Sequence, residues 1–423
     1  MKKFLFTLIA GATLSLSAQD SFVVNNVTIH TGTGQVINNG AVAVSGGKIT
    51  YVGNQPAPAN GGAVIDGAGK HLYPGFIAPN STLGLVEIES VRATRDQEET
   101  GEFNPNVRSI IAYNAESDVS ATAITNGVLM AQITPRGGRI SGTSTLVQLK
   151  AWNWEDAALK TDEGVHLNWP EPYQFTGWWA EPGGISKSKK YDESYKEMKA
   201  FFMEAAAYNK VAKPNLNDLR YSSMKGVFDG SKTLYVHATR VIQMREAIRF
   251  KNELQIPKMV FVGANDAHLI VDEIKSAGIP VIVDRVHSLP VLPEDPINQP
   301  YALAAKLVRG GLLVAINNEG DMEQAGVRNL PFMAGTCAAY GLTKEEALQT
   351  ITLNPAKIMG IDKQLGSIEV GKDATFFISA GDALDMRTNQ LSQAWIKGKS
   401  VSLENRQFEL YQRYKKKYEE AKK

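Results

Sequence analysis

The order of apolar and polar positions divides the chain into two β-rich ends and a longer α/β middle. Short alternating runs, typical of half-buried strands, occupy residues 22–66 and return over residues 365–399. Neither end has enough strands to bury a sheet face alone, because small isolated strand groups are marginally stable. We therefore expect one composite β-sandwich domain built from residues 20–73 and 365–405.

Residues 74–364 alternate unbroken apolar runs with helical patterns, which is typical of a parallel sheet. The runs that predict strands are 76–83, 128–134, 146–149, 234–238, 259–263, 281–284 and 312–316. The segments that predict helices are 195–212, 241–254, 266–277, 301–309, 344–351 and 355–359. This number of units favours a (β/α)8 barrel, whose sites lie at the carboxyl ends of the strands. An open doubly wound sheet is the alternative, although no G-x-G-x-x-G segment opens a helix.

Residues 151–232 interrupt this alternation. Five of the six tryptophans fall here, namely Trp152, Trp154, Trp169, Trp178 and Trp179. The segment is an insertion or an elaborated crossover, and its tryptophans either pack it onto the barrel or form a ligand or partner surface. Residues 406–423 predict a charged C-terminal helix.

The first 18 residues have the pattern of a cleavable signal peptide. Lys2 and Lys3 precede an apolar run over residues 4–16, and small residues follow it. A membrane anchor is the alternative, but the run is short for a bilayer span. We expect a periplasmic or secreted protein without a membrane anchor. The chain has one cysteine, Cys337, so no internal disulfide can stabilise the protein.

The amino-acid composition limits the classes of function that the chain can have. Hydrophobic residues make up 43% of the chain and charged residues 21%, as in a globular enzyme. The net charge of +1 gives no reason to expect nucleic acid as a partner. The chain has six histidines, which is few for a histidine-rich metal centre, and they form no H-x-H or H-E-x-x-H cluster.

Four sequence blocks carry a family resemblance. They are 67–70 leading into Pro-Gly-Phe-Ile at 74–77, 341–348 continued by 352–356, 365–374, and 396–401. In order and spacing they are similar to imidazolonepropionase-like amidohydrolases. The resemblance implies a distorted TIM barrel with a composite β-sandwich domain, and hydrolysis of non-peptide carbon–nitrogen bonds. It also implies one or two divalent metals, usually zinc, that activate water, and a last-strand carboxylate that moves the proton.

The first barrel strand departs from the family pattern. Asn80 and Thr82 stand where the family has its two metal-binding histidines, and Ala78 stands where it has an aspartate. Neutral amide and hydroxyl oxygens suit calcium or magnesium better than zinc. We expect Asn80 and Thr82 to contact the substrate or fill the vacated space.

Later strands keep part of the pattern. The middle-strand histidine corresponds to His237, whereas the next histidine position falls near Gly263. The last-strand aspartate corresponds to Glu319, or to Asp321 after an alignment slip of two. His237 and Glu319 are therefore the predicted catalytic residues and weak candidates for metal ligands. The inherited metal site is expected to be lost or reduced to one ion.

Further charged residues follow predicted strands and are candidates for substrate binding. Asp284, Arg285 and His287 come after one run, where they either line the barrel mouth or pair with one another at its rim. Arg136 and Arg139 flank two glycines after another run. They suit a carboxylate or phosphate ligand, or else form a surface turn.

Two functions remain open from these residues. The first is an exported hydrolase of a small amide or cyclic amide with an altered metal site. The second is a catalytically inactive paralogue that binds a ligand or serves as the partner subunit of an active amidohydrolase. Accordingly, the expected partners are a small amide-type molecule and a homodimer or heterodimer with a related amidohydrolase.

Overall fold

The structure is a computed structural model that describes residues 21–54, 56–178, 180–211, 216–292 and 294–420. The predicted signal peptide, residues 1–18, lies outside the described residues. Within the described ranges, none of the helices combines the length and the apolar character needed to cross a membrane.

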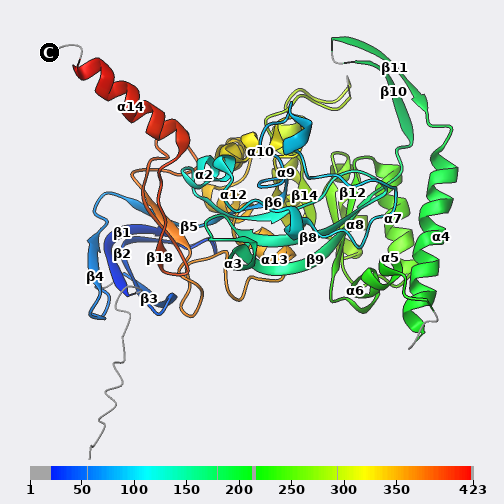
Figure 1. Cartoon of the computed structure of the whole chain (residues 1–423). Helices are drawn as coiled ribbons and strands as arrows, with labels where there is room; N and C mark the ends of the chain where they lie inside the picture. The colour runs from blue at the N-terminus through cyan, green and yellow to red at the C-terminus, as the bar shows by residue number, and fades with distance from the viewer. Residues whose placement is uncertain (1–20, 55, 179, 212–215, 293, 421–423) are drawn as a thin grey trace, which may run out of the picture.

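Both ends of the chain join one sheet beside the barrel (Figure 1). The N-terminal part supplies β1 (Phe22–His30), β2 (Val36–Ser45), β3 (Lys48–Gly53), β4 (Ala63–Asp66) and β5 (His71–Pro74). The C-terminal part supplies β16 (Phe376–Ser379), β17 (Leu391–Ile396) and β18 (Lys399–Ser400). Phe22 stacks on Trp395 with ring centroids 4.8 Å apart, so both ends of the chain share one core. The predicted composite domain is confirmed.

The middle of the chain forms an eight-stranded barrel sheet in the order β15-β14-β13-β12-β9-β8-β7-β6 among the described residues. Its strands are β6 (Phe76–Ser81), β7 (Val128–Ile133), β8 (Ile140–Gln148), β9 (Ala158–Asn168), β12 (Thr233–Ala238), β13 (Met259–Gly263), β14 (Val281–Val283) and β15 (Val314–Ile316). All neighbouring pairs are parallel except the two that involve β8. The backbone at Thr350 and Ile351 accepts hydrogen bonds from β15 and β6, which bridges the last gap. The barrel prediction is confirmed, with β8 reversed.

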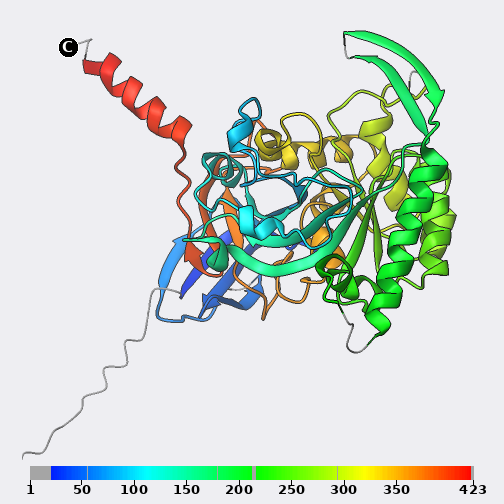
Figure 2. The same cartoon turned by 45° about the vertical axis from the view of Figure 1, so that its right-hand side comes forward.

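Helices surround the barrel sheet (Figures 1 and 2). The shorter ones are α1 (Ser109–Ala112), α2 (Asp118–Ile124), α3 (Trp154–Ala157), α5 (Leu219–Ser223), α6 (Lys225–Asp229), α8 (Val271–Ser276), α10 (Glu323–Gly326), α12 (Lys344–Gln349) and α13 (Leu353–Ile358). The longer ones are α4 (Tyr191–Lys210), α7 (Val241–Glu253), α9 (Gln299–Arg309) and α11 (Leu330–Ala339), whereas α14 (Arg406–Glu420) projects away from the barrel (Figure 1). A capping box between Thr343 and Glu346 starts α12 where the sequence predicts a helix, because each residue satisfies a free backbone N–H of the first turn.

The tryptophan-rich segment differs from the expected insertion, because β9 lies inside the barrel sheet between β8 and β12. The rest forms α4 to α6 and a hairpin, β10 (Tyr173–Trp178) and β11 (Glu181–Lys187), which reaches away from the barrel (Figure 2). Trp169 is buried in the core, whereas Trp152 is 86% exposed and Trp178 is 55% exposed. Thus one tryptophan packs the segment and others face outward.

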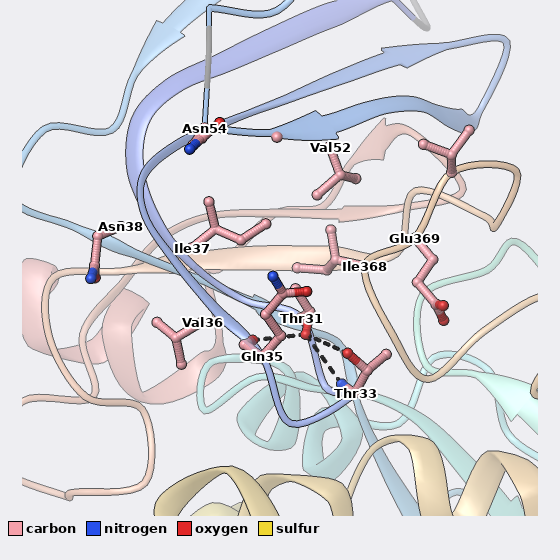
Figure 3. Close-up of a pocket in the computed structure, with 12 residues that line it drawn as sticks. Thr31, Thr33, Gln35, Val36, Ile37, Asn38, Val52, Asn54, Ile368 and Glu369 are labelled. Atoms are coloured by element: carbon pink, nitrogen blue, oxygen red, sulfur yellow. Dashed lines mark hydrogen bonds between the residues drawn. The ribbon is translucent and has the colours of Figure 1, made fainter.

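A hollow of about 750 Å³ lies on the composite sheet (Figure 3). Two of its polar side chains already bond within the protein, since Thr31 Oγ1 lies 2.8 Å from Thr33 Oγ1 and donates to the Gln35 carbonyl at 2.8 Å. Its one charged lining residue, Glu369, pairs with Lys372 at 2.7 Å. We assign no site to this hollow.

Candidate active site

The carboxyl ends of the parallel barrel strands bring most of the predicted site residues together. Asn80 lies on β6 and His237 on β12, whereas Asp284 directly follows β14 and Glu319 lies three residues past the end of β15. The loop between β7 and the reversed β8 lies at this same end and carries Arg136. The arrangement agrees with the rule that barrel sites form at this face.

Asn80 lies between Arg136 and Glu319. Its backbone φ of 49° is left-handed, a conformation that asparagine tolerates better than most residues. Its side-chain Nδ2 donates to Glu319 Oε2 at 2.5 Å, and its Oδ1 accepts from Arg136 Nη1 at 3.0 Å. Its backbone N–H donates to Gln132 Oε1 at 2.9 Å. Its carbonyl oxygen accepts from Arg136 as well, so every polar group of Asn80 is engaged by the protein.

The Arg136 guanidinium is the fixed positive charge of the site. Nη2 donates to the Asn80 carbonyl at 2.9 Å and to both Glu323 oxygens at 2.9 and 3.1 Å. Burial alone would lower the pKa of Arg136, but the charges of Glu323 and Glu319 outweigh it and raise that pKa. Arg136 therefore stays charged and neutralises part of the carboxylate cluster.

Glu319 is the ionised carboxylate of the site. Burial would raise the pKa of Glu319, but the Arg136 charge, His237 and the Asn80 hydrogen bond together lower it. His237 Nδ1 lies 3.7 Å from Glu319 Oε2. Burial lowers the pKa of His237 to about 4, against the opposing charge of Glu319, so His237 is neutral at pH 7.

Asp284 has the opposite protonation preference. Burial, followed by the negative charge of Glu319, raises the pKa of Asp284 to about 7. Asn317 links the two acids, because its Nδ2 donates to Asp284 at 3.4 Å and its Oδ1 accepts from the Glu319 N–H at 2.5 Å. Two neighbouring carboxyl groups with separated pKa values are suited to act as a base and an acid.

Asp284 also explains the missing histidine near Gly263. A Cβ atom on Gly263 would lie 3.2 Å from Asp284 Oδ2, and the backbone φ there is +91°. A larger side chain would therefore be strained and would meet the carboxylate.

A chain of buried polar groups extends from His237 into the barrel. His237 Nε2 lies 3.0 Å from His166 Nδ1, and His166 Nε2 lies 2.9 Å from Ser144 Oγ. Ser144 donates to Glu163 Oε1 at 2.7 Å, and Tyr235 donates to Glu163 Oε2 at 3.0 Å. These contacts fix the ring of His237 with Nδ1 toward Glu319.

Sequence reasoning missed His166, Glu163 and Glu323 as parts of this network. His166 and Glu163 lie on β9, inside the segment interpreted as an insertion. A signal for β9 was available, because Val165 and Leu167 alternate with the polar His166 and Asn168 as in a strand. Glu323 is found only through its spatial partner Arg136.

The remaining predicted residues have different surroundings. Arg139 Nη1 donates to the Asn168 carbonyl at 2.8 Å, and His287 Nε2 contacts Thr336 Oγ1 on α11 at 2.7 Å. Arg285 Nη1 donates to the Asp321 carbonyl at 3.2 Å. Asp321 is itself exposed, so Glu319 is the acid that faces the site. No recorded contact joins Arg139, Arg285 or His287 to Glu319, and their predicted roles stay predictions.

A cavity of about 220 Å³ opens beside Arg136 and Glu319. The buried Thr82 lines it, and its hydroxyl has no hydrogen-bond partner among the described residues. Its charged lining residues are four carboxylates and two guanidiniums, namely Glu89, Glu98, Glu319, Glu323, Arg95 and Arg136. The excess of carboxylates favours a small polar ligand that is neutral or cationic.

The residues at this place do not fit a zinc ion. Zinc prefers thiolate, imidazole and carboxylate ligands, whereas Asn80 offers an amide oxygen that already accepts from Arg136. A cation at that oxygen would meet the guanidinium charge. Among the residues that the structure describes, no group of three or more His, Cys, Asp or Glu side chains is arranged to hold a metal ion.

Comparison with known proteins agrees with this fold and these blocks. The amidohydrolase family pattern matches residues 224–401. Imidazolonepropionase from Alkaliphilus oremlandii is 23% identical over 370 residues, which is 81% of this chain and 84% of that protein. Imidazolonepropionase from Shewanella frigidimarina is 58% identical over a short stretch of 40 residues, 10% of each chain.

Solved structures show the same fold. An amidohydrolase from Thermotoga maritima superposes with a TM-score of 0.77 at 23% identity, covering 90% of this chain and 99% of that one. Molinate hydrolase superposes with a TM-score of 0.54 at 15% identity, covering 90% and 95%. The fold and the matched blocks define an α/β-barrel hydrolase class. Within that class, residues 224–401 match the amidohydrolase family, and the chain is similar over most of its length to an imidazolonepropionase.

Proposed function

We propose that this chain hydrolyses a carbon–nitrogen bond of a small amide or cyclic amide without the zinc of its relatives. The observation that carries the proposal is the pair of neighbouring acids with separated pKa values, Glu319 ionised and Asp284 protonated below about pH 7. Such a pair supplies the base and the acid that amide hydrolysis needs.

In the proposed reaction, Glu319 takes a proton from a water molecule as the water oxygen attacks the amide carbonyl carbon. Asp284 then gives its proton to the leaving nitrogen while the carbon–nitrogen bond breaks. The products are a carboxylic acid and an amine, and the proton on Glu319 restores the acid form of Asp284 through solvent. His237 acts as a positioning residue, because its neutral ring is held toward Glu319 by His166.

Arg136 supplies the positive charge that a metal supplies in the relatives' class of chemistry. Its charge keeps Glu319 ionised, and Asn80 holds it beside that carboxylate. The charge of the adjoining cavity supports a neutral or cationic substrate over an anionic one.

The experiment is turnover of a panel of small amides and cyclic amides, with matched cationic, neutral and anionic members, in the presence of a chelator. Hydrolysis that persists with the chelator and is lost in Glu319→Gln supports the proposal. Hydrolysis that requires added zinc, or no hydrolysis of any member, contradicts it.

We also propose a second candidate, a non-catalytic partner subunit, because α14 has an exposed aromatic face. Phe408, Tyr411, Tyr414 and Tyr418 are between 44% and 63% exposed, and none of the residues of α14 is buried. A shared interface through α14 would bury these rings. Sedimentation of the chain with and without residues 406–423 tests this candidate, and a monomer in both cases contradicts a homodimer.

Export follows from the sequence of residues 1–18 and stays a proposal. Fractionation of the native host supports it if the protein, shortened at its N-terminus, is found in the periplasm or the medium.

A further inference from the structure

A second cavity, of about 730 Å³, lies between α7 and the β10–β11 hairpin. Its size falls within the usual range for small-molecule sites. Three arginines line it, namely Arg240 at the N-cap of α7 and Arg245 and Arg249 one turn apart on the helix. None of these residues belongs to the Glu319 site.

Arg240 is a lining residue whose guanidinium lacks a full set of hydrogen-bond partners. It is only 7% exposed, and its Nη1 makes no hydrogen bond among the described residues. Its nearest acid is Asp266, with Nη1 and Oδ1 3.5 Å apart, beyond a normal hydrogen bond. A buried guanidinium nitrogen without an acceptor is costly unless a ligand completes it.

The other two arginines differ in how they are engaged. Arg245 forms three hydrogen bonds to Glu273, which neutralise it. Arg249 is exposed and forms no ion pair with the described residues. Asp266 and Glu294 also line the cavity, so the unbonded Nη1 of Arg240 and the exposed Arg249 are the groups left to bind an anion.

Apolar side chains complete the cavity. Tyr173 and Ile185 lie on one face of the hairpin, because Tyr173 and Lys187 are cross-strand partners and side chains two residues apart share a face. Ile242 and Leu292 line the same cavity, where Ile242 is 43% exposed and Leu292 is half-buried. An isolated two-stranded hairpin is marginally stable in water, so a ligand beneath it would add contacts.

We propose that this cavity binds a small organic carboxylate with an apolar body. The carboxylate accepts hydrogen bonds from Arg240 and Arg249, and the apolar body packs between the hairpin and Ile242. Arginine is suited to this role because its fork of N–H groups matches the two oxygens of a carboxylate.

The test uses the full chain and three probes of one shape: 4-phenylbutyrate, 4-phenylbutanol and 4-phenylbutylammonium. Isothermal titration calorimetry should give saturable binding of 4-phenylbutyrate with Kd on the order of 1 mM or tighter. The alcohol and the ammonium should bind at least about tenfold more weakly, since they lack the charge-assisted hydrogen bonds.

Variants separate this site from a general effect on folding. Arg249→Gln and Ile242→Glu alter exposed positions and should each weaken 4-phenylbutyrate binding by about tenfold. The double variant Arg240→Gln with Asp266→Asn removes the buried pair together and should abolish binding while thermal unfolding stays cooperative. Arg220→Gln, an exposed arginine paired with Asp218 outside the cavity, is the matched control.

Equal affinity for the alcohol and the carboxylate would overturn the proposal. So would unchanged affinity in Arg249→Gln and Ile242→Glu, or no saturable binding of 4-phenylbutyrate.

Discussion

Arg136 donates hydrogen bonds to both oxygens of Asn80, at 3.0 Å to the side-chain Oδ1 and at 2.9 Å to the backbone carbonyl. The same guanidinium pairs with Glu323. A protein cation therefore lies at the end of the first barrel strand, the place where the family resemblance puts two metal-binding histidines.

Loss of the Arg136 charge should destabilise the fold. Arg136→Met leaves Glu323 and Glu319 without their cation in a buried setting, which should lower the free energy of unfolding by about 3 kcal/mol. Urea denaturation measures this. Arg387→Met removes an exposed arginine paired with Asp385 and should lower the free energy of unfolding by less than about 1 kcal/mol. Equal losses of unfolding free energy in the two variants would show that the buried ion pair stabilises the fold no more than the exposed one.

Removal of the Glu319 charge should abolish catalysis more than it affects folding. Glu319→Gln keeps the shape but cannot take a proton, so kcat should fall at least about 100-fold. Asp321→Asn, two residues along and exposed, is the matched control and should keep its rate. A rate loss in Asp321→Asn equal to that in Glu319→Gln would instead support the shifted alignment.

The pH dependence of kcat/KM should have a basic limb set by Asp284. The pKa of Asp284 is raised to about 7, so the proposed acid is protonated below that pH and loses its proton above it. The rate should therefore fall as pH rises through about 7. Asp284→Asn should lower the rate and remove this limb. A limb that persists in Asp284→Asn would assign it to another group.

His237 should contribute stability that increases with pH, in opposition to Asp284, whose raised pKa of about 7 makes the folded protein hold a proton that the unfolded chain loses. The pKa of His237 is lowered to about 4 in the folded protein from 6.5, so between these values the unfolded chain binds a proton that the folded protein does not. Stability from this group is present above pH 6.5 and is lost as pH falls toward 4, by no more than about 3 kcal/mol. His237→Gln should reduce that slope in urea denaturation at several pH values. The contribution of His166 to the slope should remain, because burial lowers the pKa of His166 in the same direction.

Much of this fold is predictable from apolar patterns and four sequence blocks. The run 259–263 is an observed strand at the same bounds, because a parallel strand buried on both faces is apolar at every position. The reversal of β8 was not predictable, since antiparallel pairing depends on the loop between β7 and β8 rather than on strand composition.

The candidate site was predictable only in part. Asn80, His237, Asp284 and Glu319 follow from strand ends, where barrel chemistry lies. The sequence could not distinguish a site role for Arg136 from a position in a surface turn, because its partner Glu323 lies 187 residues away in the chain. Long-range pairs of this kind leave no local pattern.

Metal analysis of the protein purified without chelators tests the central claim most directly. If Arg136 takes the place of the inherited metal, the protein should contain less than about one zinc per ten chains, because the remaining ligands are too few for tight binding. One or two tightly held zinc ions per chain would contradict a site built on the Arg136 guanidinium.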